Sequence, residues 1–272
     1  MNLRNMIIDE INHGYSEADA SAKVCQDIII YAISASSLSR NVTIKGGVVM
    51  REKSGNTRRA TQDLDIDFIR YSLSGDSINR FISKINCIED FSIQRIGPIT
   101  ELRHQDYHGK RVNIIVYDTE GYAIKTKIDF GVNNHLEIEQ EEFCFNVTYD
   151  SDGVILLINS NEQMFVEKLR SLLIFGPIST RYKDVFDMYY LIHLLDIRKL
   201  MYCLNTYIFS DSSIRENDLD AVINRMKTTF NNITYLQHLS SSDKRWIDED
   251  IQVVLNNLLA FFDSINYNNA EQ

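Results

Sequence analysis

The segment that most constrains the fold is TQDLDIDF at residues 61–68, where acidic and apolar residues alternate strictly. Such alternation predicts a half-buried β-strand, with Asp63, Asp65 and Asp67 on one face and apolar side chains on the other. Carboxylates two positions apart on a strand lie about 7 Å apart, and at an effective dielectric constant of about 20 each adjacent pair repels by roughly 2 kcal/mol. A fold that contains this strand therefore has to accommodate a concentrated negative charge.

The acidic strand has three possible explanations. A calcium-binding EF-hand loop also begins with alternating aspartates, but it requires Gly at its sixth position and Glu at its twelfth. Phe68 and Ser74 occupy those positions, so this interpretation fails. The carboxylates can instead form a solvated strand face. They can also hold Mg²⁺ together with substrate phosphates and activate a hydroxyl group for attack on a phosphate.

Composition restricts the classes of protein. The chain has 272 residues, enough for one large domain or two ordinary ones. It has no apolar run long enough for a membrane span, and its start lacks the pattern of a signal peptide, so we expect a cytoplasmic protein with no membrane partner. Its four cysteines form no CxxC pair, which favours reduced thiols. The net charge of −10 indicates that any contact with nucleic acid uses a local basic patch.

The order of expected elements indicates an α+β fold. Helical periods occupy the first 40 residues and residues 74–85, and a short strand at NVTIK precedes the acidic strand. Further strands are predicted at 91–96, 111–118, 122–130, 142–148 and 153–158, with turns at 107–110 and 118–121. Ser160 resembles the cap of a helix, and helical periods then continue to about residue 265. We therefore predict a mixed domain over 1–160 and a helical domain over 161–272.

Two motifs lie near the acidic strand in the sequence. Lys45 and the pair Gly46–Gly47 follow the predicted strand at NVTIK, and glycines there allow backbone N–H groups to approach a phosphate, although such a pair is more often only a turn. Lys127 and Asp129 share one face of the alternating segment KTKIDFG. Asp129 would complete a site of three carboxylates if this strand pairs beside residues 63–67.

Charged residues also flank the apolar faces of two predicted helices. Lys168 lies beside such a face, where the default interpretation is a lysine whose ammonium group extends to water. Arg181 and Asp184 share a flank of the following helix. Ordinary salt bridges explain many charges of this kind, so these residues alone do not define a site.

Taken in order, these motifs resemble the AbiEii/AbiGii-type nucleotidyltransferase toxin family, which is related to the MenT toxins and to the DNA polymerase β-like nucleotidyltransferase superfamily. The resemblance covers about residues 40 to 190. The matching residues are Lys45, Gly46, Gly47, Arg59, Thr61, Asp63, Asp65, Lys127, Asp129, Glu167, Lys168, Arg181, Lys183, Asp184 and Asp187. The family often has a hydroxyl residue after the glycines, where this chain has Val48, Val49 and Met50, so that contact to the nucleotide is missing or comes from elsewhere.

The resemblance implies a polymerase-β-like nucleotidyltransferase domain over 1–160, with N-terminal helices, and a helical bundle over 161–272 that contributes to the active-site cleft. It implies transfer of a nucleoside monophosphate from an NTP, with Mg²⁺ or Mn²⁺ as cofactor and release of pyrophosphate. The implied acceptor is RNA, namely the 3′ end of tRNA. The implied context is a toxin–antitoxin or abortive phage infection system with a cognate antitoxin of the AbiEi type.

The resemblance also implies roles for individual residues. The expected catalytic residues are Asp63, Asp65, Asp129, Lys168 and Asp184, and the first three of these are the expected metal ligands. The expected nucleotide-binding residues are Lys45, Gly46, Gly47, Arg59, Thr61, Lys168 and Arg181. Apart from the resemblance, the net charge of −10 indicates that RNA would bind through a limited basic patch, for which the candidates are Arg51, Lys53, Arg58, Arg59, Lys110, Arg111, Lys125 and Lys127. The motif can assign Arg59 to the nucleotide instead, and the alternative for the whole set is ordinary solvated surface charge. Two alternatives remain: a non-catalytic nucleotide-binding module of the same fold, and transfer to a small molecule or a protein.

Overall fold

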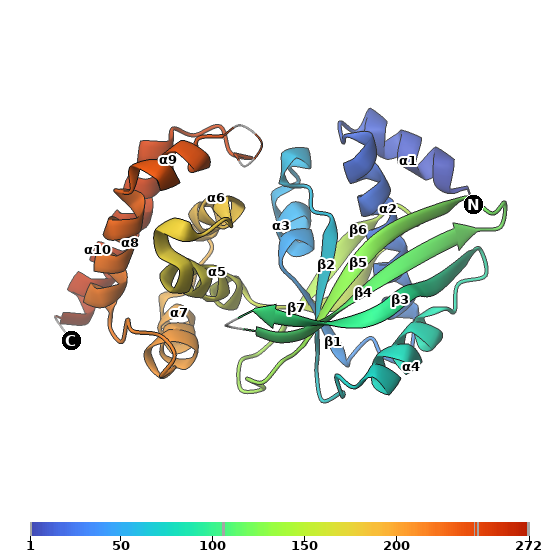
Figure 1. Ribbon diagram of the computed structural model, residues 1–272, viewed down its shortest axis with the longest axis horizontal. Coiled ribbons are helices and arrows are strands. Elements are labelled where there is room, and N and C mark those ends of the chain that lie inside the picture. The colour runs from blue at the N-terminus through green and yellow to red at the C-terminus, as the bar shows by residue number, and fades with distance from the viewer. Residues whose placement is uncertain (1, 105–106, 242, 244, 271–272) are drawn as a thin grey trace. The chain divides into compact units, whose positions relative to one another are not determined.

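The computed structural model describes residues 2–104, 107–241, 243 and 245–270 (Figure 1). The chain divides into two compact units, Met1–Asn159 and Ser160–Gln272. The first combines helices with a seven-stranded mixed sheet, and the elements of the second in the described ranges are helical, which confirms the predicted α+β class. Within the described ranges, no helix combines the length and apolar character that crossing a membrane requires.

The first unit is built around one sheet with the strand order β3-β4-β5-β2-β1-β7-β6. Strand β2 lies inside the sheet, parallel to β5 and antiparallel to β1. The elements are α1 (Leu3–Asn12), α2 (Glu17–Ala35), β1 (Val42–Lys45), α3 (Gly47–Ser54), β2 (Asp63–Phe68), α4 (Gly75–Ile85), β3 (Phe91–His104), β4 (Tyr107–Asp118), β5 (Ala123–Val132), β6 (Glu141–Val147) and β7 (Asp150–Ile158).

The two turns predicted inside this sheet have different outcomes. The turn at 118–121 is confirmed, because the Gly121 N–H donates to the Asp118 carbonyl at 3.1 Å. The turn predicted at 107–110 is wrong, because these residues begin β4. Gly109 lies opposite Leu102 and continues the β3–β4 ladder, so backbone pairing overrides the local turn preference of the glycine.

The apolar face of β2 enters the core as the alternation predicts. Leu64, Ile66 and Phe68 are fully buried. The Phe68 ring stacks on Phe130 of β5 at a centroid distance of 5.1 Å and meets the edge of Phe81 of α4 at 5.3 Å. Full burial of one such side chain contributes roughly 1.5–3 kcal/mol, so these contacts hold β2 and β5 in one register.

A buried network of charges joins the first three helices. Arg51 of α3 is 2 % exposed, and its guanidinium donates to Asp27 at 3.1 Å and to Gln26 at 2.6 Å, both on α2. The Lys23 ammonium lies 2.6 Å from the Asp27 carboxylate and 3.0 Å from Glu10 of α1. Buried charges need partners of this kind, because an unpaired one carries a large desolvation cost.

The network also reaches the segment that precedes β2, since the Gln26 amide donates to the Thr61 carbonyl at 3.0 Å. The prediction that Arg51 and Arg59 belong to an exposed basic patch is wrong, because both are buried, Arg59 at 4 % exposure. Arg51 has a structural role instead. Its contact with Asp27 links α3 to α2 and thereby positions the glycine pair at the start of α3.

The second unit consists of α5 (Asn161–Phe175), α6 (Tyr182–Leu191), α7 (Ile197–Leu204), α8 (Leu219–Phe230), α9 (Ile233–Leu239) and α10 (Ile251–Ala270). The predicted cap of α5 is confirmed, because the Ser160 hydroxyl accepts the Gln163 N–H at 3.1 Å. The helix ends at Gly176, whose φ of +50° favours glycine. Phe165 of α5 packs against Phe262 of α10 in the core.

Replacement of Arg51 tests the buried network. Arg51→Ala leaves Asp27 with one fewer cationic partner in a buried position, so the free energy of unfolding should fall by about 3–5 kcal/mol. Urea denaturation followed by circular dichroism measures this change. Arg80→Ala on the exposed surface of α4 is the control and should change it by less than about 0.5 kcal/mol. A loss below about 1 kcal/mol in Arg51→Ala would show that the network is dispensable.

Candidate active site

The acidic face of β2 meets an acidic residue on the neighbouring strand. Because β2 and β5 pair in parallel, Asp65 lies opposite Asp129 and Asp63 lies opposite Lys127. The pairing required for a three-carboxylate site is therefore present. Asp63, Asp65 and Asp129 come together although Asp129 follows Asp65 by 64 positions in the sequence.

Asp65 is the most strongly perturbed of these carboxyl groups. Its pKa is raised from the ordinary 3.8 to about 6, chiefly by burial; Lys45 lowers it, and the nearby carboxylates of Asp129, Asp63 and Asp67 contribute to the rise. Lys45 lies opposite Asp65 on β1, and its ammonium pairs with Asp67 at 2.7 Å. The charge of Asp65 therefore lacks full compensation from the protein.

The glycine pair makes room for this arrangement. Gly46 has φ +70°, and a Cβ atom there would lie 2.2 Å from the Oδ2 atom of Asp65. A Cβ atom on Gly47 would lie 2.7 Å from the Thr61 hydroxyl. Both glycines are thus required by the close approach of the chain to Asp65 and Thr61. Backbone N–H groups at this turn also begin an α-helix, where an anion is favoured.

The apolar residues after the glycines have a structural explanation. Val48, Val49 and Met50 are fully buried and anchor α3 in the core. Their side chains are therefore not available to a nucleotide. Any contact that a hydroxyl residue would supply at these positions has to come from another part of the chain.

Arg111 of β4 is a residue of the site that sequence reasoning assigned elsewhere. It lies opposite Asp129 in the β4–β5 ladder. Its Nε and Nη2 atoms donate to the two carboxylate oxygens of Asp129, each at 2.7 Å, and Nη2 also lies 3.4 Å from Asp63. The Lys127 ammonium lies 3.8 Å from Asp63. The hydrogen bonds to Asp129 raise the pKa of Arg111, so it stays charged.

The carboxylates fit a divalent cation by their chemistry. All their donor atoms are oxygens, which Mg²⁺ and Mn²⁺ prefer. The Oδ1 atom of Asp63 is buried and accepts no hydrogen bond from the described part of the chain, and the charge of Asp65 is not fully compensated. As the side chains lie, however, no group of three His, Cys, Asp or Glu residues in the described ranges is arranged to hold a metal ion. The guanidinium of Arg111 bridges Asp63 and Asp129 instead.

In the second unit, Lys168 is held between two acids. It is 8 % exposed, and its ammonium lies 3.1 Å from Asp184 and 2.7 Å from Asp187 of α6. Asp187 is fully buried and accepts a hydrogen bond of 3.0 Å from the indole N–H of Trp246. Lys168 does not extend to water as the default interpretation holds, because these acids retain it inside the unit.

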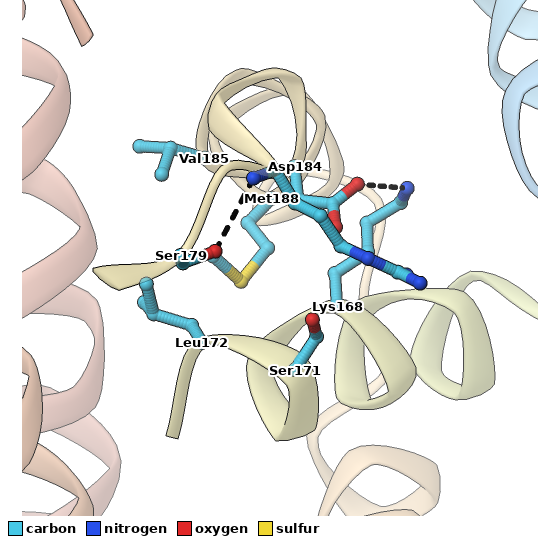
Figure 2. Close-up of a pocket in the computed structure, with 8 residues that line it drawn as sticks. Lys168, Ser171, Leu172, Ser179, Asp184, Val185 and Met188 are labelled. Carbon is cyan, nitrogen blue, oxygen red and sulfur yellow. Dashed lines mark hydrogen bonds and ion pairs between the residues drawn. The ribbon is translucent and has the colours of Figure 1, made fainter. Parts of the chain in front are cut away.

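A narrow pocket, too small to hold a water molecule, adjoins Lys168 (Figure 2). Its walls come from α5, α6 and the segment between them: Lys168, Ser171, Leu172, Ser179, Arg181, Asp184, Val185 and Met188. The buried hydroxyl of Ser171 has no hydrogen-bond partner among the residues that the structure describes, and it points into this space. The backbone N–H of Arg181 donates to the Ser179 hydroxyl at 3.3 Å.

The predicted basic patch is smaller than the sequence indicates. Besides Arg51 and Arg59, Lys53 lies over the Phe143 ring and reaches Glu141 at 4.0 Å. Lys110 pairs with Glu101 at 3.3 Å, and Arg111 is engaged by the acidic residues. Arg58, Lys125 and Lys127 remain as exposed members of the patch.

The raised pKa of Asp65 predicts a pH dependence of stability. Between pH 3.8 and about 6 the folded state binds more protons than the unfolded state, so the free energy of unfolding falls as pH rises through this window. The shift corresponds to at most roughly 3 kcal/mol. Asp65→Asn should flatten this part of the profile, measured by urea denaturation in EDTA from pH 4 to 7. An unchanged slope would contradict the assignment of the shift to Asp65.

The indole of Trp246 should stabilise the acids around Lys168. Trp246→Phe removes the donor to Asp187, and the free energy of unfolding should fall by about 1–3 kcal/mol. Far-UV circular dichroism during denaturation measures this change. A double-mutant cycle with Asp187→Asn separates the lost hydrogen bond from the lost ring volume. A coupling energy near zero would show that the contact contributes nothing.

Comparison with known proteins assigns the chain to a family. The family model described as "Nucleotidyl transferase AbiEii toxin, Type IV TA system" matches residues 28–255. A comparison with curated protein sequences gives no match.

Two solved structures are similar. A nucleotidyltransferase-like antigen from Paracoccidioides brasiliensis has 15 % identity and a TM-score of 0.44, over 68 % of this chain and 86 % of that chain. The antibiotic-resistance factor ANT(2'')-Ia has 13 % identity and a TM-score of 0.41, over 68 % and 92 %. Both likenesses are distant. The family model, in contrast, spans most of the chain, from α2 to α10. The chain therefore belongs to the AbiEii family of nucleotidyltransferase toxins and is a nucleotidyltransferase.

Proposed function

We propose that the protein transfers a nucleoside monophosphate from an NTP to the 3′ end of tRNA, with Mg²⁺ or Mn²⁺ as cofactor. The proposal rests on one observation: Asp63, Asp65 and Asp129 lie on paired strands beside the turn at Gly46–Gly47. Hard oxygen donors next to a backbone turn that favours anions suit a nucleotide bound with a divalent cation. Membership of a nucleotidyltransferase family supports the same chemistry.

The three carboxylates are the proposed ligands of the divalent cation, which would supply Lewis-acid stabilisation of the phosphate oxygens. In the transfer step, the acceptor hydroxyl oxygen forms a bond to the α-phosphorus, and the bond from that phosphorus to the β-phosphate bridging oxygen breaks. Pyrophosphate leaves. Asp129 is the proposed acceptor of the hydroxyl proton, and before the cation binds Arg111 orients its carboxylate through two hydrogen bonds.

The remaining predicted site residues have proposed roles in nucleotide binding. Lys168 would supply a positive charge to the triphosphate, and Asp184 would position its ammonium, which it contacts in the structure. Arg181 would contact a phosphate. In the first unit, the proposed nucleotide-binding residues are Lys45, Gly46, Gly47, Arg59 and Thr61, as the family resemblance implies.

The acceptor and the cellular context complete the proposal. The exposed cations Arg58, Lys125 and Lys127 are the proposed contacts to RNA. The protein would act as the toxin of an abortive phage infection system in the cytoplasm, where NTPs and tRNA are available, with a cognate antitoxin of the AbiEi type.

Labelling with each of the four α-³²P NTPs tests the proposal. Purified protein, bulk tRNA and Mg²⁺ should give labelled RNA with at least one NTP, and EDTA should abolish the signal. Asp63→Ala should reduce labelling by at least about a hundredfold, because it removes a cation ligand. Asp152→Ala, which changes an exposed aspartate outside the site, is the control and should leave labelling intact.

Other results would point to the alternatives. Label in the protein, or in an added small molecule, would replace RNA as the acceptor. Nucleotide binding without transfer to any acceptor would indicate a non-catalytic module. Full labelling by Asp63→Ala would contradict the assignment of the carboxylates.

A further inference from the structure

The contact of Arg111 with the acidic residues has a specific geometry. The guanidinium approaches Asp129 side-on, with Nε and Nη2 each 2.7 Å from a different carboxylate oxygen. The same Nη2 atom reaches Asp63 at 3.4 Å. Paired donors of this kind hold a carboxylate more firmly than a single ammonium does. Arg111 therefore fixes the orientation of Asp129 and shares its charge with Asp63.

The other cations near the carboxylates are placed differently. Lys45 directs its ammonium to Asp67, at 2.7 Å. Lys127 lies 3.8 Å from Asp63, and half of its side chain is exposed. Arg111 is thus the cation recorded in contact with both Asp63 and Asp129 among the described residues. It reduces the repulsion that the parallel pairing of β2 and β5 creates.

This placement conflicts with the binding of a divalent cation. A cation held by Asp63 and Asp129 needs carboxylate oxygens that Arg111 engages, and its positive charge would repel the guanidinium at close range. The Arg111 side chain can move away from the carboxylates without unfolding of β4, because a third of this side chain is exposed. The flexible side chain could then turn toward solvent while β4 remains paired with β5.

We propose that Arg111 is a positioning residue that occupies the cation site in the free protein. When the divalent cation binds to Asp63 and Asp129, the contacts of Arg111 with these carboxylates break. It keeps the carboxylates close together before the cation arrives, and it lowers the affinity for that cation by competing for the same oxygens. This inference rests on the proposed function, which assigns the three carboxylates as cation ligands. The role differs from that of a surface salt bridge, which would have no effect on cation binding.

Direct titration with Mn²⁺ tests the competition without any activity assay. The electron paramagnetic resonance signal of free Mn²⁺ gives the dissociation constant for the full-length protein in the absence of nucleotide. Arg111→Gln should bind Mn²⁺ about tenfold more tightly than the natural chain or better, because the variant loses a competing positive charge. Arg111→Lys keeps the charge without the paired donors and should fall between the two.

Arg95→Gln on β3 is the matched control, since it removes the same charge from the same sheet without a recorded contact to the acidic residues. Its Mn²⁺ affinity should stay within about twofold of the natural chain. Thermal unfolding supplies a second readout. In EDTA, Arg111→Gln should melt at a lower temperature than the natural chain, and added Mn²⁺ should raise its melting temperature by more than it raises that of the natural chain.

The outcomes distinguish this inference from the proposed function. If the natural chain binds Mn²⁺ and Arg111→Gln binds it equally or more weakly, the competition is wrong while the cation site stands. If neither binds Mn²⁺, the proposed cofactor is wrong and the inference falls with it. Binding by Arg111→Gln alone would support the competition. Should Arg111→Gln fail to fold, Arg111→Lys decides the question, since an affinity equal to or below that of the natural chain would overturn the inference.

Discussion

The parallel pairing of β2 with β5 is the constraint on which the rest of the first unit depends. It sets Asp65 opposite Asp129 and concentrates negative charge at one place on the sheet. The opposite face of the same strands holds this register, because Phe68 and Phe130 stack in the core. A shift by one residue would move these rings to the solvent face. Burial of apolar surface therefore keeps the carboxylates together against their repulsion.

The residues around β2 leave space for its carboxylates and hold the neighbouring segments in position. Glycine at position 46 leaves space for the Asp65 carboxylate, and no larger residue fits there without displacing it. Arg51 of α3 donates a hydrogen bond to Asp27 of α2. The Gln26 amide donates to the Thr61 carbonyl, in the segment before β2. These are buried, directional interactions, so the turn and the acidic strand are positioned by the same network.

Each unit contains a cluster of charged side chains that pair with one another, but the sign of the central charge differs. In the first unit, carboxylates are held by the guanidinium of Arg111. In the second, the ammonium of Lys168 is held by Asp184 and Asp187. In each arrangement the charges already have partners from the protein itself. In either unit a charged ligand would therefore exchange existing ion pairs rather than meet unpaired charges.

The sequence by itself determined the α+β class, most of the strands, the cap of α5 and, through the order of motifs, the family, because these depend on local periodicity and residue type. It did not reveal that Arg111 faces Asp129 or that Arg51 is buried, and it placed a turn where β4 begins. These features were decided by tertiary structure. Which residues face one another across strands, and which charges enter the core, follow from the packing of distant segments. An arginine that neutralises a buried acid has the same local sequence signal as one on the surface.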